Sequence, residues 1–187
     1  RAGSNGSVQR NHVAKEEAVA PTVMLEAILV QSTIYAHESR DVAMCNIPGA
    51  FLQADNPDFV LMRLDGILAE LMMKIAPTLY CKYVLYLQLE KAVYGMMKSA
   101  LLFYRKLVAD LTSIGFEINP YDPCVANKLI DGKQMTICWH VDDLFIGHDD
   151  PNVVTTFLKW LAKRYDTDDK KLNVVRGHKH NYLRMNL

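Results

Sequence analysis

Apolar and polar residues follow two different rhythms along the chain, and these rhythms predict its helices and strands. Helices are expected where apolar residues recur three and four positions apart, over residues 21–37, 68–76, 99–114 and 150–165. Strands are expected for short apolar runs bounded by turn residues, at 41–47, at 59–64 and in a run that ends near Leu89. Pro21 suits a helix start, and Gly115 suits a helix C-terminal cap.

The C-terminal half carries the strongest hairpin signals. Asp131-Gly132 stands between two apolar runs and predicts a two-residue hairpin loop. A second hairpin is expected at Asp142-Asp143, because the apolar runs 135–141 and 144–147 flank the two acids. The tail 172–187 predicts one or two further strands. Together these elements predict an α+β fold with helices on one face of an antiparallel sheet.

Composition restricts the class of protein without deciding its function. The 187 residues are 50% hydrophobic and carry no net charge, which favours one folded domain over a disordered chain. Neutral charge gives no global attraction to nucleic acid, although a local basic groove would still suffice. No apolar run approaches the roughly 18 residues that span a bilayer, so we expect no membrane partner. The four cysteines are widely spaced, which favours reduced thiols and an intracellular location.

The adjacent carboxylates Asp142 and Asp143 are the main candidate for chemistry. Side chains of neighbouring strand residues point to opposite faces, but at a tight turn both can converge. Two carboxylates against a hydrophobic sheet cost several kcal/mol to desolvate unless a cation joins them, and Mg²⁺ is the natural one. A pair of metal ions would need a third carboxylate from a neighbouring strand, for which 41–51 is the candidate. The alternative is a solvated hairpin tip that happens to carry two acids.

Five segments in order resemble the motifs of copia-type retrotransposon reverse transcriptases. They read NIPGAFLQAD, KAVYGMMKSALLFY, INPYDPCVANK, WHVDDLFIGHDDP and RGHKHNYLRM. The resemblance runs from about Gln9 to the last residue. It implies a right-handed polymerase palm with partial fingers, with residues 1–38 as a fingers remnant and first helix and 39–187 as the palm. It also implies that thumb, RNase H and integrase regions of a retroelement polyprotein lie outside this fragment.

The resemblance assigns roles to single residues. Asp142 and Asp143 match the paired metal-binding aspartates. Phe51 matches an aromatic gate that would favour deoxynucleotides, and Gly95 matches a backbone turn beneath the template and incoming nucleotide. The implied activity is RNA-directed DNA polymerisation with two Mg²⁺ ions, an RNA or DNA template with its primer, and deoxynucleoside triphosphates. A cytoplasmic retroelement particle is the implied location.

Departures from the family pattern lower the expected activity. Asn46 stands where the first motif carries a catalytic aspartate, and Asp41, five residues upstream, is expected on the other face of the sheet. Lys98, expected to bind substrate, replaces the usual glutamine and could contact backbone phosphate, and Arg184 replaces a motif glycine. We therefore expect weak or no polymerase activity. The alternatives are a non-catalytic remnant that at most binds nucleic acid and, less favoured, a palm-like nucleotide cyclase.

Some residues favour structural roles instead. Tyr94 and Phe103 are expected in the core. His178 and His180 have the spacing of alternate strand positions, but no further ligands are evident beside them, so surface histidines are expected.

Overall fold

The computed structural model describes residue 14 and residues 18–78, 84–177 and 179–187. The elements follow one another as α1 (Leu25–His37), β1 (Asp41–Asn46), η3 (a 3₁₀-helix, Ala50–Gln53), β2 (Leu61–Asp65), α2 (Gly66–Ile75), β3 (Val84–Gln88), α3 (Ser99–Ser113), β4 (Glu117–Ile118), β5 (Val125–Ile130), β6 (Lys133–His140), β7 (Asp143–His148), α4 (Pro151–Tyr165), β8 (Asn173–Arg176), β9 (Asn181–Tyr182) and β10 (Met185–Asn186). The mixture of helices and antiparallel sheets confirms the predicted α+β class. The division into fingers and palm stays a prediction.

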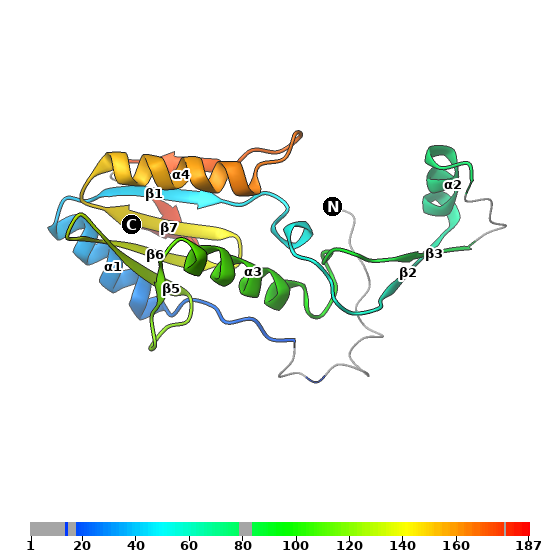
Figure 1. The fold of residues 1–187 in the computed structure, drawn as a ribbon, viewed down its shortest axis with the longest axis horizontal. Helices are drawn as coiled ribbons and strands as arrows, with labels where there is room; N and C mark the ends of the chain where they lie inside the picture. The colour runs from blue at the N-terminus through cyan, green and yellow to red at the C-terminus, as the bar shows by residue number, and fades with distance from the viewer. Residues whose placement is uncertain (1–13, 15–17, 79–83, 178) are drawn as a thin grey trace.

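A six-stranded antiparallel sheet has the strand order β4-β5-β6-β7-β1-β8 (Figure 1). This sheet and the helices α1, α3 and α4 that lie on it are called the body below. The expected loop at Asp131-Gly132 joins β5 to β6, and both residues have positive φ, at 50° and 77°. Positive φ at both central positions is the geometry of a type I′ turn, whose twist matches that of the flanking strands. The second expected hairpin is also present, because β6 and β7 pair on either side of Val141 and Asp142.

Helices cover both faces of this sheet, which corrects the expectation of a single helical face. On one face Tyr104 of α3 lies against Trp139 of β6, with ring centroids 6.4 Å apart, and α4 packs along β7 and β1. On the other face Tyr35 of α1 lies 5.1 Å from Phe145. Gly147, on the same face as Phe145, leaves the room for the Tyr35 ring, because a Cβ at Gly147 would come within 2.5 Å of ring carbons.

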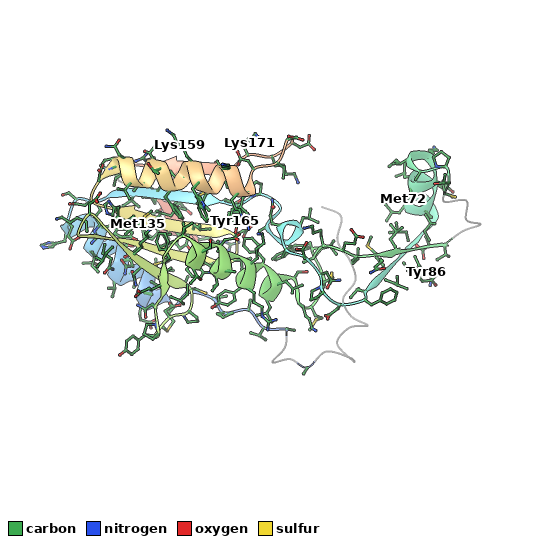
Figure 2. All side chains as sticks on the ribbon, viewed as in Figure 1. Met72, Tyr86, Met135, Lys159, Tyr165 and Lys171 are labelled. Carbon is green, nitrogen blue, oxygen red and sulfur yellow. The ribbon has the colours of Figure 1, made fainter. Side chains whose placement is uncertain are left out.

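The segment β2-α2-β3 forms an arm that extends away from the body (Figure 1). The two strands pair with each other in a sheet of their own, and Leu64, Ala69 and Leu85 make a small separate core. Figure 2 shows Met72 and Tyr86 on this arm, whereas Met135 and Tyr165 lie inside the body. The two parts differ in burial accordingly: Tyr86 is 62% exposed, and Met135 and Tyr165 are fully buried.

Several element bounds differ from the predicted ones. The first helix begins at Leu25 and not at residue 21, because the backbone N–H of Met24 is bound by the Asp122 carboxylate at 2.8 Å before the helical bonds begin. The strand expected at 59–64 is β2, which begins at Leu61. Within the described part of the chain, no helix has the length and apolarity that crossing a bilayer requires.

Candidate active site

The two acids lie at the turn between β6 and β7, as the sequence predicts. His140 and Asp143 are the last residues that pair across this hairpin, so Val141 and Asp142 form its two-residue loop. Val141 has a φ of 56°, a conformation that costs a β-branched residue more than most. Asp142 and Asp143 are both half-buried. The turn therefore holds two carboxylates at the edge of the core and not at a fully solvated tip.

Asn46 meets the acidic turn from the neighbouring strand. It pairs with Asp143 in the register of β1 with β7, and its side-chain Nδ2 donates to Asp143 Oδ1 at 2.7 Å. The next residue, Ile47, donates its backbone N–H to the Asp142 carbonyl at 2.9 Å. The orientation of the amide follows from its partner, because only the NH₂ group can donate to a carboxylate. Positions 46 and 143 are therefore direct neighbours across β1 and β7, and position 46 contributes an amide to this contact.

Asp41 is placed away from this site. Its cross-strand partner is His148, and it differs from Asn46 by an odd number of positions, so the two side chains point to opposite faces of β1. The Asp41 carboxylate is also paired with the Arg176 guanidinium on the adjacent strand β8. Asp41 therefore lies away from Asn46 and Asp143, on the other face of the sheet, as expected.

Phe51 lies on η3, shortly after Asn46, and forms an aromatic pair with Tyr94. The two rings are stacked with centroids 5.9 Å apart and an interplanar angle of 25°. Gly49 begins this short helix in the left-handed conformation, with φ at 61°. Tyr94 is 58% exposed, so the expectation that it belongs to the core is wrong, whereas Phe103 is fully buried as expected. Together Phe51 and Tyr94 present an aromatic surface that is partly open to solvent.

Gly95 and Lys98 occupy the turn that leads into α3. Gly95 has a φ of 97°, a conformation that glycine adopts without strain, which fits the backbone turn expected there. The Lys98 ammonium is 2.8 Å from the Asp58 carboxylate. Lys98 is thus engaged in an ion pair near the base of the arm, and a phosphate would have to compete with Asp58 for it.

The described residues contain no group of three or more His, Cys, Asp and Glu side chains placed to hold a metal ion. Cys45, the neighbour of Asn46, is an unreactive thiol, because burial and then the charges of Asp166 and Asp143 raise its pKa to about 12. His180 is buried, at 6% exposure, with Nε2 2.7 Å from the Gly177 carbonyl oxygen, so the expectation of a surface histidine is wrong there. His178 lies outside the described residues.

Tyr182 is a contact of the site that the sequence did not point to. Its hydroxyl donates to the backbone carbonyl of Asp143 at 3.0 Å, although 39 positions separate the two residues. Nothing in the local pattern around Tyr182 indicates this contact, because the tail predicts only short strands of unknown partner. What points to the contact is that the side chain of Tyr182 is buried although it carries a polar hydroxyl, and the sequence alone does not show that burial.

Comparisons with known proteins identify the family to which the chain belongs. Residues 1–178 match the family described as "Reverse transcriptase (RNA-dependent DNA polymerase)". Over 167 residues, 89% of its length, the chain is 26% identical to the "Retrovirus-related Pol polyprotein from transposon RE1" of Arabidopsis thaliana. That stretch is 11% of the relative, so the chain spans only about a tenth of its length.

Proposed function

Since the chain belongs to the reverse transcriptase (RNA-dependent DNA polymerase) family, we propose that it is the polymerase palm, with part of the fingers, of a retrotransposon polyprotein and that Asn46 impairs its catalysis. The observation that carries the proposal is the contact of Asn46 with Asp143 at 2.7 Å. This contact joins the first family motif to the acidic pair across two neighbouring strands. The resemblance predicted from the sequence is confirmed by the match.

The proposed reaction is nucleotidyl transfer to a primer. The primer 3′-oxygen forms a bond to the α-phosphorus of a deoxynucleoside triphosphate, pyrophosphate leaves with the broken P–O bond, and the hydroxyl proton passes to solvent. Asp142 and Asp143 would hold magnesium, which in this chemistry activates the attacking oxygen and neutralises the departing pyrophosphate. The donor set suits one hard cation. A second cation about 4 Å away needs a third carboxylate, and position 46 supplies a neutral amide.

Asn46 weakens the site through charge and also through geometry. It contributes no negative charge, and its NH₂ group already donates to the oxygen of Asp143 that would face a cation. Loss of one preorganised charge-stabilising group costs about 10²–10³ in rate. We expect activity lower by at least this factor than that of a chain with an acid at position 46.

The other residues of the site fit binding roles for a template–primer and a deoxynucleotide. The half-buried Phe51 ring, supported by Tyr94, would lie against the sugar and disfavour a ribose 2′-hydroxyl. Gly95 provides the turn beneath the nucleotide, and Lys98 would contact phosphate after separating from Asp58. The remainder of the polyprotein would supply the regions of the polymerase that this chain does not contain.

A primer-extension assay on poly(rA)/oligo(dT) with Mg²⁺ tests the proposal. The chain as it stands should extend the primer weakly or not at all, and Asn46→Asp should raise the rate at least about a hundredfold. Asn152→Asp, on the exposed first turn of α4, is the matched control that adds a carboxylate elsewhere and should leave the rate unchanged. Vigorous extension by the unmodified chain would contradict the assigned role of Asn46.

The second candidate function is nucleic-acid binding without catalysis. The Asn46–Asp143 hydrogen bond favours it as well, because the bond satisfies the acid internally with no cation. This candidate predicts duplex binding that weakens as salt concentration rises and no gain of extension in Asn46→Asp. The primer-extension comparison and a salt titration of duplex binding therefore separate the two functions.

A further inference from the structure

Tyr182 connects the C-terminal β9–β10 hairpin to the turn that carries the two acids. The side chain is 1% exposed, and its hydroxyl donates to the Asp143 carbonyl at 3.0 Å. Its ring is stacked on Phe145, the residue two positions after Asp143, with centroids 5.4 Å apart and an interplanar angle of 25°. One side chain thus contacts β7 through both its ring and its hydroxyl.

The hydroxyl lies where the β6–β7 hairpin closes. Its acceptor, the carbonyl of Asp143, belongs to the last residue pair of the hairpin, Asp143 with His140. The phenolic O–H is the donor in this bond, because a carbonyl oxygen can only accept. The carbonyl of Asp142 is bound separately by the Ile47 N–H. Two bonds from two different elements therefore fix the carbonyls of two successive acidic residues.

The β9–β10 hairpin has a backbone conformation that its loop residues do not favour. Its two-residue loop, Leu183 and Arg184, has φ values of 50° and 67°, the positive φ at both positions that a type I′ turn requires. Neither residue adopts this conformation readily, since Gly, Asn and Asp are the favoured residues there. His180 and Leu187 close the hairpin with two backbone bonds of 2.9 and 2.8 Å. The Tyr182 contacts connect this strained hairpin to the sheet.

We propose that Tyr182 is a positioning residue for the acidic pair: through its hydroxyl it fixes the backbone of Asp143 and thereby the direction of the Asp143 carboxylate. The proposal rests on the assignment of Asp142 and Asp143 as the cation-binding pair under the proposed function. Outer contacts that orient metal ligands typically change metal affinity by about 10–100-fold when they are lost. The hydroxyl of Tyr182 is such an outer contact, made to the ligand's own backbone.

The test removes this hydroxyl while keeping the ring. Tyr182→Phe is compared with Tyr165→Phe, which removes an equally buried hydroxyl whose partner is Asp110, between α3 and α4. Both are made in the Asn46→Asp chain, and Mn²⁺ binding is followed by electron paramagnetic resonance. Tyr182→Phe should weaken Mn²⁺ binding about tenfold, whereas Tyr165→Phe should lower the melting temperature without changing Mn²⁺ affinity. Equal Mn²⁺ affinities in Tyr182→Phe and its parent would overturn the proposal, and so would equal losses in the two tyrosine variants.

A second measurement needs neither metal nor activity. In the unmodified chain, the side-chain NH₂ of Asn46 reports the position of the Asp143 carboxylate through their 2.7 Å bond. Its ¹⁵N–¹H signals should shift in Tyr182→Phe and stay in place in Tyr165→Phe. If the Asn46→Asp chain binds Mn²⁺ but does not extend a primer, the polymerase assignment fails and the Mn²⁺ comparison still decides the role of Tyr182. If it binds no Mn²⁺, unchanged Asn46 signals in Tyr182→Phe overturn the proposal.

Discussion

Replacing Asn46 by aspartate should destabilise the metal-free chain, and the size of the effect follows from one contact. The Asn46 Nδ2 is 2.7 Å from Asp143 Oδ1. The substitution removes a hydrogen bond to a charged group, worth about 1.5–3 kcal/mol. It also places two negative charges about 4 Å apart, which repel by about 4 kcal/mol at an effective dielectric constant near 20.

Two effects limit this sum. The pair of carboxylates at positions 46 and 143 can take up one proton, which at pH 7 costs about 4 kcal/mol for an ordinary aspartate. Because this proton would remove the repulsion between the two charges, the repulsion cannot destabilise the chain by more than about 4 kcal/mol. Both side chains are half-buried, so solvent screening and rotation of a carboxylate reduce it further. We expect the free energy of unfolding to fall by about 2–4 kcal/mol, which for a chain of this size lowers the melting temperature by roughly 5–15 °C.

The assay is equilibrium unfolding in EDTA and then in excess Mg²⁺, for the parent chain, Asn46→Asp and the exposed control Asn152→Asp. In EDTA only Asn46→Asp should lose stability, and the loss should shrink as the pH is lowered to about 4, because one member of the pair is then protonated. A cation at 100 times its dissociation constant should return about 2.7 kcal/mol. Undiminished stability of Asn46→Asp in EDTA would refute the contact, and a loss that Mg²⁺ does not reverse would refute the cation site.

Three further changes test other parts of the fold. Asp110 accepts hydrogen bonds from Arg164 and two other side chains; burial alone would raise the pKa of Asp110, but these bonds outweigh burial and lower it. The contribution of Asp110 to stability is therefore present above pH about 4 and lost on acidification below it. Acid titration of the Asp110→Asn variant should lack this loss of stability. Gly147→Ala should lower the free energy of unfolding by at least about 1–3 kcal/mol in thermal unfolding, because the added Cβ would come within 2.5 Å of the Tyr35 ring. An unchanged free energy of unfolding would mean that α1 packs elsewhere. Burial, followed by nearby charges, raises the pKa of Cys138 to about 12, so iodoacetamide should modify Cys138 only as denaturant unfolds the chain. Rapid labelling of Cys138 in the native protein, detected by mass spectrometry, would contradict the fold.

Local sequence signals predicted those parts of the molecule in which the residue types themselves favour the backbone conformation that they adopt. Asp131-Gly132 specifies its own turn, because these residues tolerate the positive φ that they adopt. The β6–β7 hairpin and the neighbouring strand β1 were predicted from apolar runs. The contact between positions 46 and 143 was expected from the family resemblance, which pointed to position 46 in the first motif, and the structure supplied the strand register. The contact of Asn46 with Asp143 was accessible because both residues lie in short segments with clear sequence signals.

Tertiary packing decided the rest, and the sequence gives weaker signals for it. The helix α1 is apolar on more than one side, with Ile28 and Tyr35 buried while Leu25 and Leu29 are about half exposed. Its pattern therefore does not identify which side of the sheet it covers. The exposure of Tyr94 depends on whether anything covers the rings beside η3, and the burial of Tyr182 depends on a hairpin docking on a distant strand. Neither is a property of residues close in sequence.

Under the proposed function, the amide at position 46 would affect folding and catalysis through the same nitrogen atom, the Nδ2 that donates to Asp143. A carboxylate oxygen there would repel Asp143 until a cation joined them, so a chain with aspartate at this position depends on metal for the stability of its β1–β7 edge. The Asn46 NH₂ group instead donates to Asp143 and satisfies that acid without metal. If the proposed function holds, the loss of a charge used in catalysis and the gain of stability without a cation would both follow from this one substitution. Under the proposed function, an amide at position 46 would lower catalysis without changing the apolar residues that form the sheet, so the hydrophobic pattern around the site would stay the same.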